Sequence, residues 1–234
     1  MKTIFGFIFV VGIIVFPIGN ACSQTKVQIS ALYSSFYLND IRKSQQNRLN
    51  YLPFEAKIVD DFPPYWGIKG KLLFQINNTL NIGVTEFLTS TGGRISYQDY
   101  SGSFLFDQNL ILNSLGGTIE AIVHKQEVLS IYFGISLNAD YSIYDFSSEL
   151  IVLPDYQETE KQKLSAFGMS IWPYLELDQK LIENVFVNFA IGYQQKLFIS
   201  EFKNDTYMAV AADWSGIRAE IGISYIFNAQ LNSD

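Results

Sequence analysis

The chain has 234 residues with a formal net charge of −7 at pH 7; 15% of the residues are aromatic and 17% are charged. This length allows a single all-β domain, and the negative charge argues against nucleic-acid binding, which needs clustered Lys and Arg. One cysteine, Cys22, and one histidine, His124, leave few catalytic or metal-binding arrangements.

Residues 1–23 have the pattern of a signal peptide. Lys2 supplies a positive charge, and the apolar stretch 4–18 is short for a membrane-spanning helix. We therefore expect Sec-type export and a mature domain of residues 24–234. A lipoprotein alternative stays open, because Cys22 follows Gly-Asn-Ala at a place where a lipid anchor could be attached.

Alternation with period two runs through the mature chain and predicts β-strands. In 129–141, the odd positions are apolar and the even positions are mainly small or polar. Clear or weaker versions of this pattern predict eight strands, at 26–37, 65–76, 80–91, 109–123, 129–141, 165–177, 185–196 and 217–227. No later apolar run is long enough for a membrane helix, so only a closed barrel could cross a bilayer.

The connections between these strands alternate in length. Short polar turns are expected at 77–79, 124–126 and 178–184, and longer connections at 38–64, 92–108, 142–163 and 200–211. An up-and-down barrel in the outer membrane has this alternation, with tight periplasmic turns and larger external loops. The prediction is an all-β fold, an eight-stranded antiparallel up-and-down transmembrane β-barrel in the cell outer membrane, with outer-membrane lipid around it.

Two residues conflict with this pattern. Glu86 is in phase with Ile82 and Val84, so it would face lipid unless a bulge shifts the register or it lies near the headgroups. Pro173 lies inside the sixth strand and lacks the backbone N–H that a paired strand needs. A closed barrel has no edge strand where this loss is tolerated, so a β-bulge is expected there.

The final strand carries a possible assembly signal formed by Glu220, Gly222, Tyr225 and Phe227. A polar residue, a glycine and a terminal aromatic pair resemble the C-terminal β-signal of outer-membrane proteins, although seven residues follow Phe227. The mature chain as a whole resembles the small eight-stranded outer-membrane barrels of the OmpA, OmpX and OmpW-like superfamily. The resemblance implies the outer-membrane barrel assembly machinery as a partner.

If the apolar face meets lipid, the polar face lines the interior. Eight strands leave an interior just wide enough for side chains, so buried charges must pair or be hydrated. Eight charged side chains are expected there, namely Lys69, Lys71, Glu120, Asp140, Glu176, Lys196, Arg218 and Glu220. Four are basic and four acidic, which favours a salt-bridged plug; a narrow polar path for solutes is the alternative.

Several aromatic and acidic residues are expected at the ends of the barrel. Membrane-interface belts are expected to include Tyr65, Trp66, Tyr141, Trp214 and Tyr225. The acidic segment 145–161 lacks EF-hand spacing and is predicted to be a solvated loop.

The sequence offers no recognisable catalytic or cofactor motif. A Ser–His arrangement at the outer rim would need a histidine there, whereas His124 falls in a predicted periplasmic turn. Phosphate-binding glycine motifs, zinc spacings and dinucleotide fingerprints are absent from the sequence. We therefore expect a protein that is not an enzyme, with no catalytic residue, cofactor or metal.

The leading functional hypothesis is an outer-membrane barrel with a structural, adhesive or accessory role. Its exposed loops would provide the variable surface, for an unidentified extracellular or envelope protein. One alternative is a narrow pore or transporter for small solutes or apolar molecules. Another is a soluble, secreted, lipocalin-like barrel, with its apolar face inward around a ligand and its charged face in water.

Overall fold

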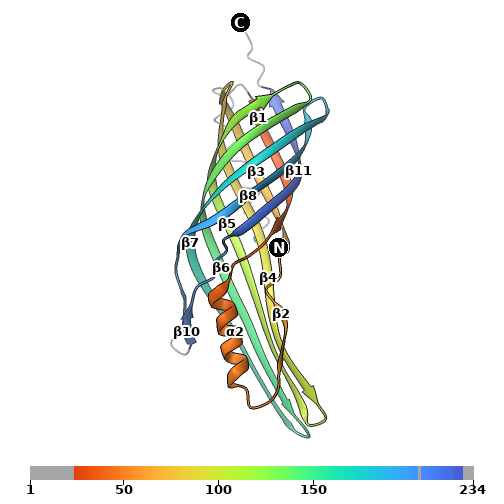
Figure 1. Cartoon of the computed structure of the whole chain (residues 1–234), viewed down its shortest axis with the longest axis vertical. Coiled ribbons are helices and arrows are strands. Elements are labelled where there is room, and N and C mark those ends of the chain that lie inside the picture. The colour runs from red at the N-terminus through yellow and green to blue at the C-terminus, as the bar shows by residue number, and fades with distance from the viewer. Residues whose placement is uncertain (1–23, 205–206, 229–234) are drawn as a thin grey trace.

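The computed structural model describes residues 24–204 and 207–228, and most of them lie in one closed β-sheet (Figure 1). The ring strands are β1 (Gln24–Ser34), β3 (Tyr65–Asn77), β4 (Leu80–Asp99), β5 (Gly102–Lys125), β6 (Leu129–Val152), β7 (Tyr156–Ile182), β8 (Val185–Ile199) and β11 (Gly216–Asn228). Each pairs with its neighbours in antiparallel fashion, and β1 pairs with both β3 and β11, which closes the ring. The predicted eight-stranded up-and-down barrel is confirmed.

The barrel has two different ends. The short-turn end, at the top of Figure 1, carries the connections at 78–79, 126–128 and 183–184, together with the start of β1 and the end of β11. The long-loop end carries the connections at 35–64 and 200–215 and the turns at 100–101 and 153–155. The predicted signal peptide and Cys22 lie outside the described residues.

Four of the strands are much longer than predicted. Most of 92–108 and 142–163 is strand rather than loop, because β4–β5 and β6–β7 continue as hairpins beyond the ring. We call residues 93–107 and 144–164 the extension. Its outer face is polar, and Arg94 pairs there with Asp107 at 2.5 Å. The alternation of apolar outward and polar inward residues, which predicts the strands, therefore stops before the strands end. The predicted acidic loop 145–161 belongs to this sheet.

The first long connection contains the helix α2 (Asn39–Tyr51) and the short strand β2 (Lys57–Asp61), which pairs with β4. Ile41 and Gln45, one helical turn apart, form the buried side of α2. The last connection contains the hairpin of β9 (Phe202–Asn204) and β10 (Tyr207–Val210). Within the described part of the chain, no helix combines the length and apolar character needed to cross a bilayer.

Alternation along the strands separates two faces. Large apolar side chains such as Ile29, Phe189 and Ile221 lie exposed on the outside, whereas Lys71, Glu176 and other charged residues are buried inside. A lipocalin-like barrel requires the opposite orientation, with apolar side chains inside. The lipocalin-like alternative is therefore wrong for the ring near the short-turn end, where the charged side chains are buried inside.

The structure answers differently for Glu86 and Pro173, the two residues that conflict with the predicted alternation. The register of β4 is continuous on both sides of Glu86, which therefore faces outward, directly opposite Gly70 on β3. The expected bulge at Pro173 is wrong. The irregularities between β7 and β8 lie between Met169 and Ser170 and between Lys180 and Ile182, and the pairing of β7 with β6 runs through Pro173 without a shift.

Candidate functional sites: the filled interior and the long-loop end

The interior near the short-turn end contains a chain of buried ion pairs, which we call the lumen network. Its members are Lys26, Lys69, Lys71, Glu120, Glu176, Asp178 and Glu220. Lys26 contacts Glu176 at 2.7 Å and Asp178 at 2.5 Å, and Lys71 contacts both Glu176 and Glu120 at 2.5 Å. The network crosses the barrel because its members come from β1, β3, β5, β7 and β11.

Aromatic rings surround the lysines of this network. Lys69 pairs with Glu220 at 2.7 Å, and its Nζ lies 3.7 Å from the centroid of the Trp172 ring. Tyr174 donates to Glu120 at 2.8 Å and fills the space beside Gly134, where a Cβ would lie 2.3 Å from the tyrosine ring. The buried charges are thus matched by both ion pairs and ring faces, which compensates part of their desolvation.

A second polar layer lies next to the network, on the side of the long-loop end. Asp140 accepts a hydrogen bond from Ser114 at 2.5 Å. Arg218 is completely buried and donates to the side-chain oxygen of Gln194 at 2.9 Å and to the main-chain oxygens of Ser35 and Trp214 at 3.0 and 2.8 Å. Arg218 therefore links the strand interior to both long connections.

Seven of the eight charges expected in the interior are buried there. Five of them form ion pairs in the lumen network, while Asp140 and Arg218 occupy the second polar layer, toward the long-loop end. Lys196 differs: it is partly exposed near the long-loop end, where it pairs with Asp213 at 2.9 Å.

Sequence reasoning missed two members of the network. The predicted turn 178–184 includes Asp178, but β7 continues to Ile182 and keeps Asp178 in the inward phase of Tyr174 and Glu176. Lys26 shares the inward phase of Gln28 on β1. Extending the inward phase of the predicted strand 165–177 by one residue would have found Asp178, and Lys26 already lies in the inward phase of the predicted strand 26–37.

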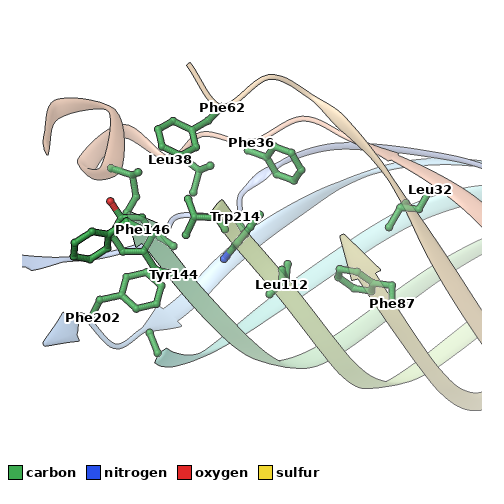
Figure 2. Packing of buried hydrophobic residues seen from close by; sticks show 14 of the residues in the cluster. Leu32, Phe36, Leu38, Phe62, Phe87, Leu112, Tyr144, Phe146, Phe202 and Trp214 are labelled. Carbon is green, nitrogen blue, oxygen red and sulfur yellow. The ribbon is translucent and has the colours of Figure 1, made fainter. Parts of the chain in front are cut away.

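Beyond Arg218 the interior is filled by apolar side chains, which we call the apolar plug (Figure 2). The long connections supply Phe36, Leu38, Phe62, Phe202 and Trp214, and the strands supply residues that include Phe87, Leu112, Tyr144 and Phe146. Figure 2 shows these side chains converging from opposite walls. The plug closes the barrel where the lumen network ends.

Trp214 is part of this plug and not of a membrane-interface belt. It is 2% exposed, its ring meets Phe36 edge-on at 5.2 Å, and its Nε1 donates to Ser142 at 2.8 Å. The expected interface position of Trp214 is therefore wrong, although the other four aromatic residues of that prediction lie on the surface. Trp214 has the inward parity of Arg218, which is the signal that places it inside.

Hydrogen bonds fasten the first connection over the opening. Arg42 of α2 donates to the main-chain oxygens of Tyr37 at 2.8 Å and Phe62 at 2.9 Å, and it pairs with Asp61 at 3.1 Å. Gln45 donates to the main-chain oxygen of Asp60 at 3.1 Å. These contacts tie the helix to both ends of its own loop.

The extension ends in an exposed tip formed by Tyr100, Val152, Leu153 and Tyr156. The two hairpin turns are joined by a hydrogen bond from the main-chain N–H of Leu153 to the oxygen of Ser101 at 2.9 Å. The carboxylate of Asp155 lies in one of these turns, and those of Asp99 and Glu158 lie in the adjoining ends of β4 and β7. The hydroxyl groups of Tyr97 and Ser101 donate to the Asp99 carboxylate and lower its pKa.

The predicted assembly residues lie along β11. Glu220 points inward to Lys69, and Gly222 faces Ser30, whose Oγ would be 2.2 Å from a Cβ at that position. Tyr225 and Phe227 lie on the outer face, with ring centroids 4.6 Å apart. The tail after Asn228 lies outside the described residues.

His124 lies near the end of β5 at the short-turn end and is exposed, far from the long-loop end. It falls in strand rather than in the predicted turn, because β5 continues to Lys125 past a register shift. Over 24–204 and 207–228, no cluster of three or more His, Cys, Asp or Glu side chains has a geometry that could hold a metal ion.

No family model and no curated protein matches the sequence. Among solved structures, the outer membrane protein OprG of Pseudomonas aeruginosa is similar, with a TM-score of 0.51, 10% identity, and coverage of 89% of this chain and 97% of OprG. The chain has the fold of a small outer-membrane β-barrel. At this identity the likeness concerns the fold alone.

Other outer-membrane barrels match with lower scores. The attachment invasion locus protein Ail of Yersinia pestis has a TM-score of 0.43 and 13% identity, over 88% of this chain and 99% of Ail. The outer membrane protease OmpT of Escherichia coli has a TM-score of 0.38 and 11% identity, over 87% of this chain and 96% of OmpT.

Proposed function

We propose that this protein is a sealed, non-enzymatic outer-membrane barrel that binds an external protein partner through the tip of its extension. The observation that carries the proposal is the extension itself. Four strands continue beyond the ring as a hydrogen-bonded sheet and end in exposed aromatic and aliphatic side chains. The role is adhesive or accessory rather than one of transport.

The filled interior supports this role over that of a pore. A recess of about 350 Å³ opens at the short-turn end, and Lys26 is among the residues that line it. Beyond Lys26, the lumen network, Arg218 and the apolar plug follow one another along the barrel. A solute would have to displace paired charges and then a packed apolar cluster, each of which is unfavourable.

The chemistry of the tip indicates the kind of partner. Tyr100 is 94% exposed, and Leu153 is 60% exposed. Exposed apolar groups that gather in one place commonly mark a protein interface. Because Asp99, Asp155 and Glu158 lie around them, the complementary surface combines apolar groups with Lys or Arg.

The orientation in the envelope follows from the two ends. Tight turns face the periplasm and the extension faces the outside, as in known barrels of this type. Residues 1–23 would direct export and be removed. The β11 residues Glu220, Gly222, Tyr225 and Phe227 would be read by the assembly machinery during insertion.

Attachment of cells tests the proposal. Cells that display the wild-type protein should attach to protein-coated surfaces or to one another more than cells without it. The double variant Tyr100→Ser/Leu153→Ser should reduce attachment to the background level, because it removes apolar contact area but no hydrogen bond of the sheet.

The matched control is Tyr37→Ser, which removes an exposed aromatic side chain outside the tip. It should leave attachment unchanged, and all three proteins should keep a heat-dependent gel mobility. Equal attachment of the double variant and the wild type would contradict the proposed function.

A further inference from the structure

One ionisable side chain, that of Glu86, lies on the apolar outer face of the ring. Apart from His124 at the short-turn edge, Glu86 is the one carboxylate, Lys, Arg or His that faces outward from the ring strands outside the extension, counting residues 24–204 and 207–228. It lies six residues after the start of β4, which for a tilted strand places it roughly 15 Å from the short-turn end along the barrel axis. An apolar band about 25 Å tall would therefore enclose it.

Glu86 has no hydrogen-bond or ion-pair partner among the described residues. Its position is not a consequence of an irregular strand, since the flanking Thr85 and Phe87 are buried inside as the alternation requires. A polar group that faces hydrocarbon without a partner is unfavourable, and such residues in membrane proteins commonly serve a function.

The surroundings of Glu86 are also unusual. Gly70 lies directly opposite it on β3 and Leu115 directly opposite it on β5, while Gly117 lies opposite the adjacent outward residue Val84 on β5. The outward residue Asn113 is paired with Leu88, one outward position along β4. We call Gly70, Glu86, Asn113 and Gly117 the Glu86 patch. On the other side of the barrel the outer face consists of large apolar residues such as Leu175, Ile191 and Ile223.

We propose that the Glu86 patch is the contact surface between two copies of this chain in the membrane. Small residues allow two surfaces in a bilayer to approach closely, and polar side chains then bond across the contact. Outside the extension, the ring strands offer no outward Lys or Arg within the described residues, so a heterologous contact between the membrane-facing parts of two copies would leave Glu86 without a complement.

Two-fold symmetry makes a second copy of this chain a suitable binding partner for the Glu86 patch. A two-fold axis along the membrane normal keeps both copies at the same depth and brings the same patch of each into contact. The two Glu86 carboxyl groups then meet at one level in the apolar layer, where the neutral, protonated form is favoured and each carboxylic acid can donate to and accept from the other. Asn113 adds amide groups to the same contact.

Association can be measured with the full chain in lipid vesicles, using copies labelled on exposed lysines with donor or acceptor dyes. The wild type should show energy transfer that rises with the protein-to-lipid ratio and saturates as dimers form. Glu86→Leu should weaken association about tenfold, or about 1.4 kcal/mol. Glu86→Gln should retain it, because two amide groups can also form a closed hydrogen-bonded pair.

Two controls separate association from folding. Ile221→Ala, on β11 at the other side of the barrel, should associate like the wild type. Glu86→Leu should keep its heat-dependent gel mobility, because leucine is compatible with lipid. Energy transfer no greater than random mixing in the wild type, or equal association of Glu86→Leu and the wild type, would overturn the proposal. Neither outcome bears on binding at the tip.

Discussion

A lysine inside a protein needs a carboxylate to balance its charge, and Lys69 has both Glu220 and the face of Trp172. This pair is simpler than the branched part of the lumen network, where Glu176 serves Lys26 and Lys71 together. Lys69 and Glu220 are therefore the best place to ask what the network contributes to the stability of the barrel.

We expect Lys69→Leu to lower the free energy of unfolding by about 3–5 kcal/mol, because it leaves Glu220 buried without a counter-charge. The double variant Lys69→Leu/Glu220→Leu should lose less than the sum of the two single variants. Denaturant unfolding of protein refolded in detergent micelles measures all four proteins. Strictly additive losses would show that the two side chains are not coupled.

At the scale of elements, the closure of the long-loop end depends on α2. Its sequence is strongly polar, and Ile41 is its one fully buried aliphatic residue. Arg42 compensates by binding main-chain oxygens on both sides of the helix. The position of α2 is thus maintained by a few specific hydrogen bonds more than by a broad apolar face.

Arg42→Ala should release α2 without unfolding the barrel. Hydrogen exchange at the amides of α2 should become faster, because the Tyr37 and Phe62 carbonyls lose their donor, while exchange in the ring strands stays unchanged. Lys43→Ala, one residue away and exposed, is the matched control and should exchange like the wild type. Unchanged protection of α2 in Arg42→Ala would refute this role.

The ring strands could be predicted from the sequence because lipid outside and polar groups inside impose a strict alternation, as along Leu129–Tyr141. The same criterion failed where water replaces lipid. In the extension, Arg94 and Asp107 bond to each other on an outer face that no longer needs apolar residues, so strand was read as loop. The helix α2 was not predicted, because its polar sequence has no continuous apolar stripe.

The interior was predictable in part for a related reason. Charged residues inside regular strands, such as Glu176, could be assigned from parity, whereas Asp178 near a strand end could not. The apolar plug was not predicted, because residues such as Phe62 and Phe202 come from long connections whose path into the barrel leaves no periodic signal. Tertiary packing decides their position.

At the scale of the whole molecule, the barrel consists of three successive layers. The lumen network occupies the half near the short-turn end, Arg218 lies at the boundary, and the apolar plug fills the half near the long-loop end. Beyond the plug, the extension projects the tip away from the ring (Figure 1). This order separates a sealed membrane part from an exposed binding part.

Single-channel recording in planar bilayers tests the sealed interior most directly. Purified wild-type protein, with insertion verified by its heat-dependent gel mobility, should produce no stepwise ionic current. Arg218→Ala should also remain closed to ions as long as the apolar plug stays in place. Steady conductance steps in the wild type, with an amplitude that Arg218→Ala changes, would show an open polar path and contradict the account.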